Sequence, residues 1–380
     1  MRERFGNESG GVTVLVATVV ASLLLIGSIA LVVDSGVVYL ERRAVANAAQ
    51  SAALALAREC VTDPRNCIRS TMPQDLANAN SPDSLTAVVE ICVNGKTITQ
   101  ANCAATTPST IDCSAVPVTE SQWVRVRTQS KSQIPGVGVE TFFSQNRNET
   151  LKACAQARWG NAASASSFTP FGISICEWAR NKSGILREYT TNNGVAPCSW
   201  TFADMNGETT TATGISGWVA LDLMSTSIPA SARASVACPN PATESGAYLR
   251  VGYELSQITK SQSSQDYCGN GNLASKMNQW LERTLYIPLV STPKLSGQAT
   301  VHRIEAFAGF KLLGYALLRG QGNASTTGGN FPNGNWCPNN TSCIYGEFVS
   351  TFSPNSEVNT DPNVPQVGLQ AIQLFQDYEQ

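Results

Sequence analysis

The chain has 380 residues, a formal net charge of −2 and a charged fraction of only 14%, with 12 cysteines and a single histidine. Lys and Arg form no long run, which argues against a nucleic-acid-binding protein. No Cys-x-x-Cys pair occurs and one histidine cannot complete the usual mixed zinc site, so we expect no metal and no cofactor.

The first element is an uncharged stretch of 22 residues, Val12–Val33. As a helix it would span roughly 33 Å, enough to cross a hydrocarbon core of about 30 Å. Its apolar core is longer than that of a cleaved signal peptide, which favours a retained anchor. We expect residues 1–11 to form a cytoplasmic stub and residues 12–33 a single transmembrane helix.

The cysteines decide the predicted orientation. Flanking charge is nearly balanced, because Arg2 and Arg4 precede the span while Arg42 and Arg43 follow it. All 12 cysteines lie at or beyond Cys60, and disulfides form in oxidising compartments. We therefore expect a cell-membrane protein with a cytoplasmic N-terminus and an extracellular C-terminal domain.

Helical character continues over residues 34–58, which are rich in Ala and Leu and contain no proline. Four small or apolar residues recur at three- and four-residue steps and form one stripe: Val45, Ala48, Ala49 and Ala52. Small side chains allow another backbone to approach closely. The stripe is predicted to line a helix-packing contact, either with the chain's own ectodomain or with a partner helix.

Residues 59–115 are predicted to form a cysteine-rich loop region, because their cysteines stand among Asn, Thr and Pro. Proximity in the sequence favours four disulfides, although spacing alone does not fix the connectivity. The expected pairs are Cys60 with Cys67, Cys176 with Cys198, Cys238 with Cys268, and Cys337 with Cys343.

Residues 116–380 are predicted to form a β-rich domain, because short runs with strand character alternate with Gly, Asn, Ser and Pro. The overall class is α+β: a long N-terminal helix followed by a disulfide-stapled, mainly antiparallel, sandwich-like ectodomain. Residues 231–268 are expected to be an inserted loop and helix, residues 321–335 a loop, and residues 366–375 a strand or short helix. Strands are expected at 123–128, 151–159, 171–178, 217–223, 248–255, 283–290, 299–318 and 343–352.

Strings that resemble catalytic motifs are incomplete, so we expect no enzyme. His302 is the single histidine and lies in an alternating, strand-like segment without a Gly-x-Ser-x-Gly elbow in the chain. Ser291 and Lys294 spell Ser-x-x-Lys, but Pro293 disfavours the helix start at which that dyad works. The seven tryptophans are expected mainly in the core.

A family resemblance rests on the block 10–57. It contains Val33-Asp34-Ser35-Gly36, then Tyr39-Leu40-Glu41-Arg42-Arg43, then Ala46-Asn47-Ala48-Ala49-Gln50-Ser51-Ala52-Ala53-Leu54. This block resembles the N-terminal module of TadE/TadG-like proteins, which are associated with the assembly of Flp-type tight-adherence pili. The segments 170–178, 217–222, 306–310 and 343–348 look like ectodomains of pilus-assembly relatives in Gram-positive actinobacteria.

Two departures narrow what the resemblance implies. The fifth residue after Gly6 is Gly11 and the fifth after Gly11 is Val16, so the glutamate of a processed prepilin is missing. The string Asp222-Leu-Met-Ser225-Thr-Ser227 has the wrong spacing for the Asp-x-Ser-x-Ser metal site of a von Willebrand A domain. The resemblance implies an accessory or minor-pilin role rather than a metal-dependent adhesin head.

The expected function is a non-enzymatic, membrane-anchored component or assembly factor of Flp/Tad-type pili. Its expected partners are the bilayer, pilins or pilus-assembly membrane proteins bound through the N-terminal helix, and cell-wall or host surface ligands, with no nucleic acid. The alternatives are a surface adhesin unrelated to pili and a cell-envelope hydrolase.

Overall fold

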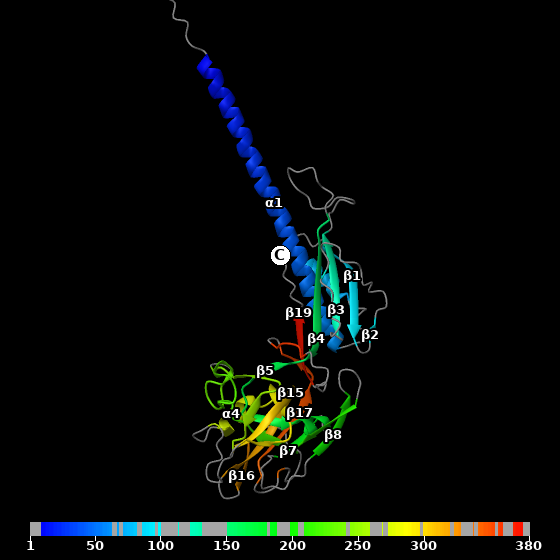
Figure 1. Cartoon of the computed structure of the whole chain (residues 1–380), viewed down its shortest axis with the longest axis vertical. Helices are drawn as coiled ribbons and strands as arrows, with labels where there is room; N and C mark the ends of the chain where they lie inside the picture. Colours follow the sequence, from blue (N-terminus) through cyan, green and yellow to red (C-terminus); the bar gives the residue numbers. More distant parts are fainter. Residues whose placement is uncertain are drawn as a thin grey trace, which may run out of the picture. The chain divides into compact units, whose positions relative to one another are not determined.

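The computed structural model describes most of the chain. The residues described are 9–62, 67, 71–81, 86–95, 98–99, 113, 122–130, 150–180, 183–187, 198–203, 209–240, 244–258, 268, 273–296, 299–319, 323–327, 337, 341–353, 356–359 and 368–374. A long N-terminal helix is followed mainly by strands (Figure 1), which confirms the coarse prediction of an apolar helix followed by a β-rich, disulfide-bonded region.

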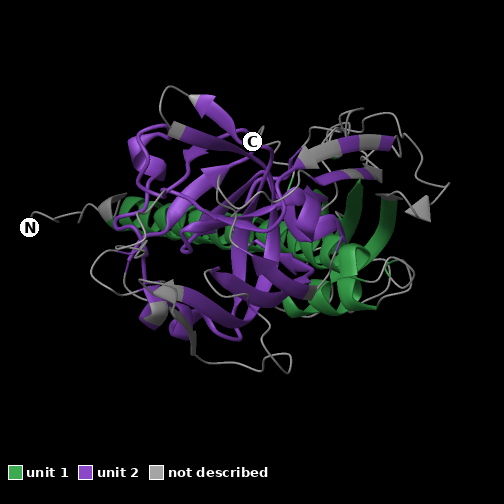
Figure 2. Ribbon diagram, turned by 90° about the horizontal axis from the view of Figure 1, so that it is seen from below, with its two compact units in different colours: residues 1–158, 374–380 green, residues 159–373 purple. Residues whose placement is uncertain are grey.

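The chain divides into two compact units, coloured separately in Figure 2. Unit 1 comprises residues 1–158 and 374–380, and unit 2 comprises residues 159–373. The boundary therefore lies near Arg158, whereas the sequence placed the start of the β-rich domain at residue 116. The reason is that the first strands of the expected domain pair with an earlier strand in unit 1.

Helix α1 runs without interruption over Ser9–Thr62. Ala and Leu favour helix throughout its second half, and Pro64 is the first proline in the chain. Three hydroxyls in the apolar half, those of Thr18, Ser22 and Ser28, donate to carbonyls four residues earlier. These local bonds satisfy polar groups within an otherwise apolar surface.

Unit 1 packs the second half of α1 on an antiparallel sheet. Its further elements are α2 Met72–Ala79, β1 Thr86–Gly95, β2 Ile98–Thr99, β3 Trp123–Ser130 and β4 Lys152–Asn161, of which residues 152–158 belong to this unit. The strands follow the order β4-β3-β1-β2. On β3 the side chains of Val124, Val126 and Thr128 are buried, as expected for one face of an alternating strand.

The prediction that residues 59–115 form loops was wrong for much of the region, because α2, β1 and β2 lie within it. Strand β1 is hard to recognise because the register against β3 shifts between Val88 and Glu90. The bulge leaves Val89 54% exposed, between the half-buried Val88 and Glu90, and interrupts the two-residue period.

Unit 2 is built mainly from strands (Figure 1). Its elements are β5 Ser164–Ser167, β6 Phe171–Ser174, α3 Ile175–Arg180, β7 Ser183–Arg187, β8 Cys198–Ala203, β9 Thr209–Gly214, β10 Trp218–Ala220, the 3-10 helix η2 Ala230–Ala232, β11 Ala247–Arg250, β12 Glu254–Ser256, α4 Leu273–Trp280, β13 Thr284–Val290, β14 Lys294–Ser296, β15 Ala299–Arg319, β16 Asn323–Thr327, β17 Cys343–Val349, β18 Thr351–Phe352 and β19 Leu369–Leu374.

The main sheet of unit 2 has the order β10-β6-β13-β15-β17-β7, and β12, β14 and β16 also pair with the long strand β15. Both faces of this sheet are apolar. On β10, Trp218 and Ala220 belong to one buried cluster, while Val219 belongs to the other. Phe171 contacts Trp218 and Trp280 edge-on, with ring centroids 5.8 and 5.9 Å apart. Because successive side chains of a strand point to opposite faces, this one sheet contributes to two buried cores.

Three local expectations for unit 2 need correction. The strand expected over 171–178 ends at Ser174, and α3 follows, with Glu177 in its first turn and Arg180 in its last, where the helix dipole favours them. Strand β16 occupies part of the loop expected over 321–335, because it pairs with β15. In the described part of 231–268 there is η2 but no α-helix, and α4 begins only at Leu273.

Candidate functional site

The first half of α1 presents apolar side chains that no described part of the chain covers. Every residue from Val12 to Val33 is exposed except the half-buried Ala30, and Leu24 is 68% exposed. Among the described residues, α1 is the one helix long and apolar enough to cross a membrane. This exposed apolar half is the main candidate functional surface of the chain.

The second half of α1 is covered by its own unit. All four residues of the predicted stripe, Val45, Ala48, Ala49 and Ala52, are fully buried. The Thr128 hydroxyl on β3 donates to the Val45 carbonyl over 2.9 Å, and the Asn80 amide donates to the Ser51 hydroxyl over 3.0 Å. Of the two alternatives left open by the sequence, the structure has the stripe packed on its own chain, where it is not available to a partner.

The opposite side of this half remains exposed. Leu40 is 62% exposed, and Arg43, Asn47 and Leu54 continue along the same side of the helix. Successive residues in an α-helix are rotated by about 100°, so these positions lie on one face. A partner helix therefore has this face and the apolar half available to it.

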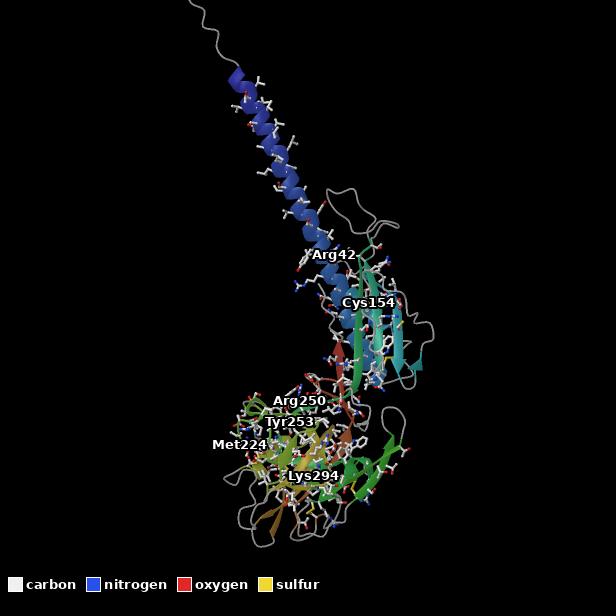
Figure 3. The ribbon with its side chains drawn as sticks, in the orientation of Figure 1. Arg42, Cys154, Met224, Arg250, Tyr253 and Lys294 are labelled. Atoms are coloured by element: carbon white, nitrogen blue, oxygen red, sulfur yellow. A yellow bond between two sulfur atoms is a disulfide. The ribbon has the colours of Figure 1, made fainter. Side chains whose placement is uncertain are left out.

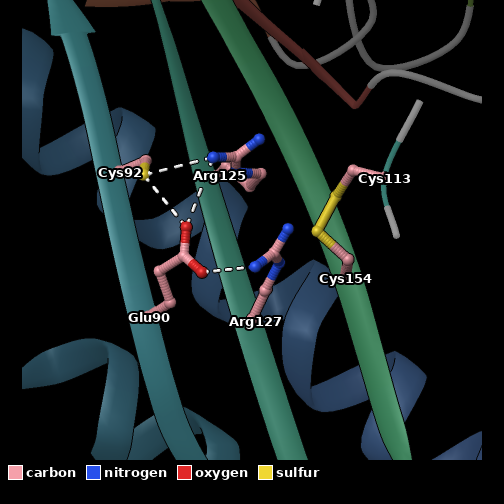
Figure 4. Close-up of a disulfide and its surroundings, with 6 residues drawn as sticks. All are labelled: Glu90, Cys92, Cys113, Arg125, Arg127 and Cys154. Atoms are coloured by element: carbon pink, nitrogen blue, oxygen red, sulfur yellow. Dashed lines mark hydrogen bonds and ion pairs between the residues drawn. A yellow bond between two sulfur atoms is a disulfide. The ribbon is translucent and has the colours of Figure 1, made fainter. Parts of the chain in front are cut away.

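The sheet face that points away from the stripe carries a charged cluster, shown in Figure 4. Glu90 on β1 accepts from Arg125 over 3.3 Å and from Arg127 over 2.6 Å. Arg125 also lies over the Trp123 ring, 5.9 Å from its centroid. The alternation of residues 123–128 predicted the strand, but only the register of β1 against β3 reveals Glu90 as the partner.

A disulfide joins Cys113 to Cys154 beside this cluster (Figure 4), and the sequence did not predict this pair. Its cysteines are 41 positions apart, and proximity carries no signal at that distance. The structure also contains the four disulfides expected from proximity: Cys60–Cys67, Cys176–Cys198, Cys238–Cys268 and Cys337–Cys343. No cysteine among the described residues is free.

His302 is fully buried on β15 in unit 2. Its Nε2 lies 3.2 Å from the Gln257 side-chain oxygen, and its Nδ1 lies 3.5 Å from the Ser291 carbonyl oxygen. Burial lowers the pKa of His302 from 6.5 to about 4, against a smaller raising effect of the Ser291 carbonyl. The ring is therefore neutral at physiological pH and contacts one side-chain amide and one backbone carbonyl, neither of which is a nucleophile.

The other motif-like strings lie in ordinary structure. Lys294 opens the strand β14 and is exposed, so the Ser-x-x-Lys string does not lie at a helix start. The Ser225 and Ser227 hydroxyls are 2.8 Å apart within a turn, and Asp222 accepts from the Met224 amide. No cluster of three metal-binding side chains occurs in the part of the chain that the structure describes.

Comparisons with family models, with curated proteins and with solved structures gave no match for this chain. The functional argument therefore depends on the residues and on the geometry of α1.

Proposed function

We propose that the chain is a non-enzymatic, membrane-anchored component or assembly factor of Flp/Tad-type pili, similar to TadE/TadG-like proteins. The observation that supports this proposal is the division of α1 into two halves. The first half exposes an uninterrupted apolar surface, and the second half forms the core of an antiparallel sheet unit. Such a helix needs lipid or other apolar helices around its first half.

Such a helix is typical of a protein that moves from the bilayer into an assembly, or that binds other membrane proteins while it stays in the bilayer. Its apolar half can be surrounded by acyl chains before assembly and by neighbouring helices afterwards. Meanwhile the buried stripe keeps the folded unit attached, because Val45 and Ala49 are packed within it. We propose that pilins or assembly proteins contact the apolar half and the exposed face at Leu40, Asn47 and Leu54.

The same proposal places the N-terminus in the cytoplasm and both units outside the cell. The disulfides Cys113–Cys154 and Cys176–Cys198 support this side, because they lie one in each unit and require an oxidising compartment. Unit 2, proposed to pack its sheets in a sandwich-like manner, would be presented to the filament, the cell wall or a host surface.

Site-specific photo-crosslinking in the producing cell tests the proposal. A benzophenone amino acid at Leu24 is expected to capture a pilin or an assembly membrane protein, and deletion of the gene is expected to abolish piliation. The matched control is the same probe at Val89, which is 54% exposed on β1, outside the apolar half, and is expected to capture neither. Normal piliation in the deletion strain, together with no protein adduct at Leu24, would overturn the proposal.

A further inference from the structure

Three exposed side chains form a compact group just beyond the apolar half of α1. Tyr39 is 64% exposed, and Arg42 and Arg43 are exposed as well (Figure 3 labels Arg42). Arg42 stands three residues after Tyr39 and Arg43 stands four after it, so all three lie on one helix face. We call this group the basic collar.

The side chains of the collar are exposed although this half of the helix packs on the sheet of unit 1. At about 100° per residue, Tyr39 and Arg43 lie roughly opposite the buried Ala48, and Arg42 lies at the edge of the buried stripe, one turn before Val45. No ion pair within the described part of the chain involves Arg42 or Arg43. Below the collar, Ser35 and Gly36 are small and exposed, and nothing lies within 4 Å of a Cβ built on Gly36.

The side chains of the collar can reach back to the lipid headgroups when Val12–Val33 fills the hydrocarbon core. Tyr39 is six residues past Val33, about 9 Å along the helix axis, and the arginines are about 14–15 Å past it. Side chains on a helix point back toward its N-terminus, and the long arginine stems reach farther back than the others. The headgroup layer is about 5–8 Å thick on each side, so the phenol and both guanidinium groups extend to it.

The carboxylates in this region are turned inward. Asp34, the first charged residue after the span, is only 8% exposed and has an interaction within the chain. Glu41 is half-buried and also has an interaction within the chain. The exposed charge next to the bilayer is therefore the pair of arginines.

We infer that Tyr39, Arg42 and Arg43 bind the phosphate groups of anionic phospholipids in the leaflet at the C-terminal end of the span. Guanidinium groups donate bidentate hydrogen bonds to phosphate, and tyrosine rings favour the membrane interface. The small residues Ser35 and Gly36 leave room for a headgroup between the collar and the acyl chains. This inference rests on the membrane anchoring in the proposed function, but not on any role in pili.

Lipid selectivity of the reconstituted full chain tests the inference. The protein is placed in phosphatidylcholine vesicles that contain spin-labelled phosphatidylglycerol or spin-labelled phosphatidylcholine, and the motionally restricted fraction of each is measured. Each arginine near the surface is expected to raise the relative association of phosphatidylglycerol up to about fivefold. In R42Q/R43Q the restricted fraction of phosphatidylglycerol is expected to fall to about that of phosphatidylcholine. R42K/R43K is expected to keep part of the preference for phosphatidylglycerol.

The matched control is K152Q/K294Q, which removes the same charge from two exposed lysines elsewhere in the chain. The control is expected to keep the selectivity of the unmodified protein. Equal selectivity in R42Q/R43Q and the unmodified protein, or an equal loss in the control, would overturn the inference. Alkaline carbonate washing separates the two proposals: release of the protein from vesicles contradicts the anchoring, whereas retention without selectivity contradicts only the collar.

Discussion

The hydroxyl of Thr128 on β3 donates a 2.9 Å hydrogen bond to the backbone carbonyl of Val45 in α1. A strand side chain reaches the helix backbone here because the neighbouring helix residues, Ala44, Ala48 and Ala49, are small and buried. This contact joins α1 to β3 within unit 1, between residues that are 83 positions apart in the sequence.

Thr128→Val is expected to remove that bond with little change in volume. Because the hydroxyl is buried, the free energy of unfolding should fall by about 0.5–1.5 kcal/mol. Hydrogen exchange of the full chain in detergent should show faster exchange in the second half of α1. Thr211→Val, at an exposed position on β9, should leave that exchange unchanged. Unchanged exchange in the Thr128 variant would show that the bond contributes nothing.

Ala48→Leu tests whether the stripe is packed against its own sheet. Added atoms in this fully buried site should destabilise unit 1 by about 1–3 kcal/mol, because a close-packed core has no room for them. Ala21→Leu makes the same change at an exposed position in the apolar half and should have no such effect. Thermal unfolding followed by circular dichroism measures both, and equal midpoints for the two variants would contradict the packing.

Gly217 and Gly252 both have positive φ, at 96° and 87°, so alanine at either position meets the same kind of backbone strain. The two positions differ in the room that they leave for a Cβ atom. A Cβ on Gly217 would collide with the Arg187 carbonyl oxygen, whereas the nearest atom to one on Gly252 is 4.0 Å away on Arg303. Gly217→Ala should therefore lower the denaturation midpoint clearly more than Gly252→Ala does. Equal denaturation midpoints for the two variants would show that the positive φ alone, and not the collision with Arg187, causes the loss of stability.

His302 predicts an acid-side loss of stability. Burial depresses its pKa to about 4, while an unfolded histidine binds a proton near pH 6.5. The contribution is therefore complete above pH 6.5 and is lost as the pH falls from 6.5 toward 4, by up to about 3 kcal/mol. Because His302 is the single histidine, His302→Gln should flatten the stability between pH 7.5 and 5.5. If His302→Gln keeps the original slope of stability against pH, other titratable groups cause that slope.

Thiol labelling tests whether the two units lie in an oxidising, extracytoplasmic compartment. No described cysteine is free, so protein denatured directly from its native membrane should take up no maleimide at these positions until it is reduced. Mass spectrometry before and after reduction measures the difference. Labelling of Cys176 and Cys198 without reduction would contradict an extracytoplasmic location for unit 2.

Features set by neighbouring residues were predictable. The apolar run Val12–Val33, the alternation that begins at Trp123 and the short cysteine loops depend on local periodicity or short chain closure. Each of these patterns can be read within a window of a few residues to a few turns. The observed α1, β3 and the disulfide Cys60–Cys67 follow from such patterns.

Features that join distant residues required the tertiary structure. The pairing of Glu90 with Arg127 depends on the register of β1 against β3, which a bulge at Val89 shifts. The Cys113–Cys154 bridge and the burial of Ala48 depend in the same way on which segments meet. Local sequence restricts each segment to a helix or a strand, but the choice of neighbour comes from packing summed over the whole unit. For that reason the sequence predicted the stripe on α1, and only the fold decided what covers it.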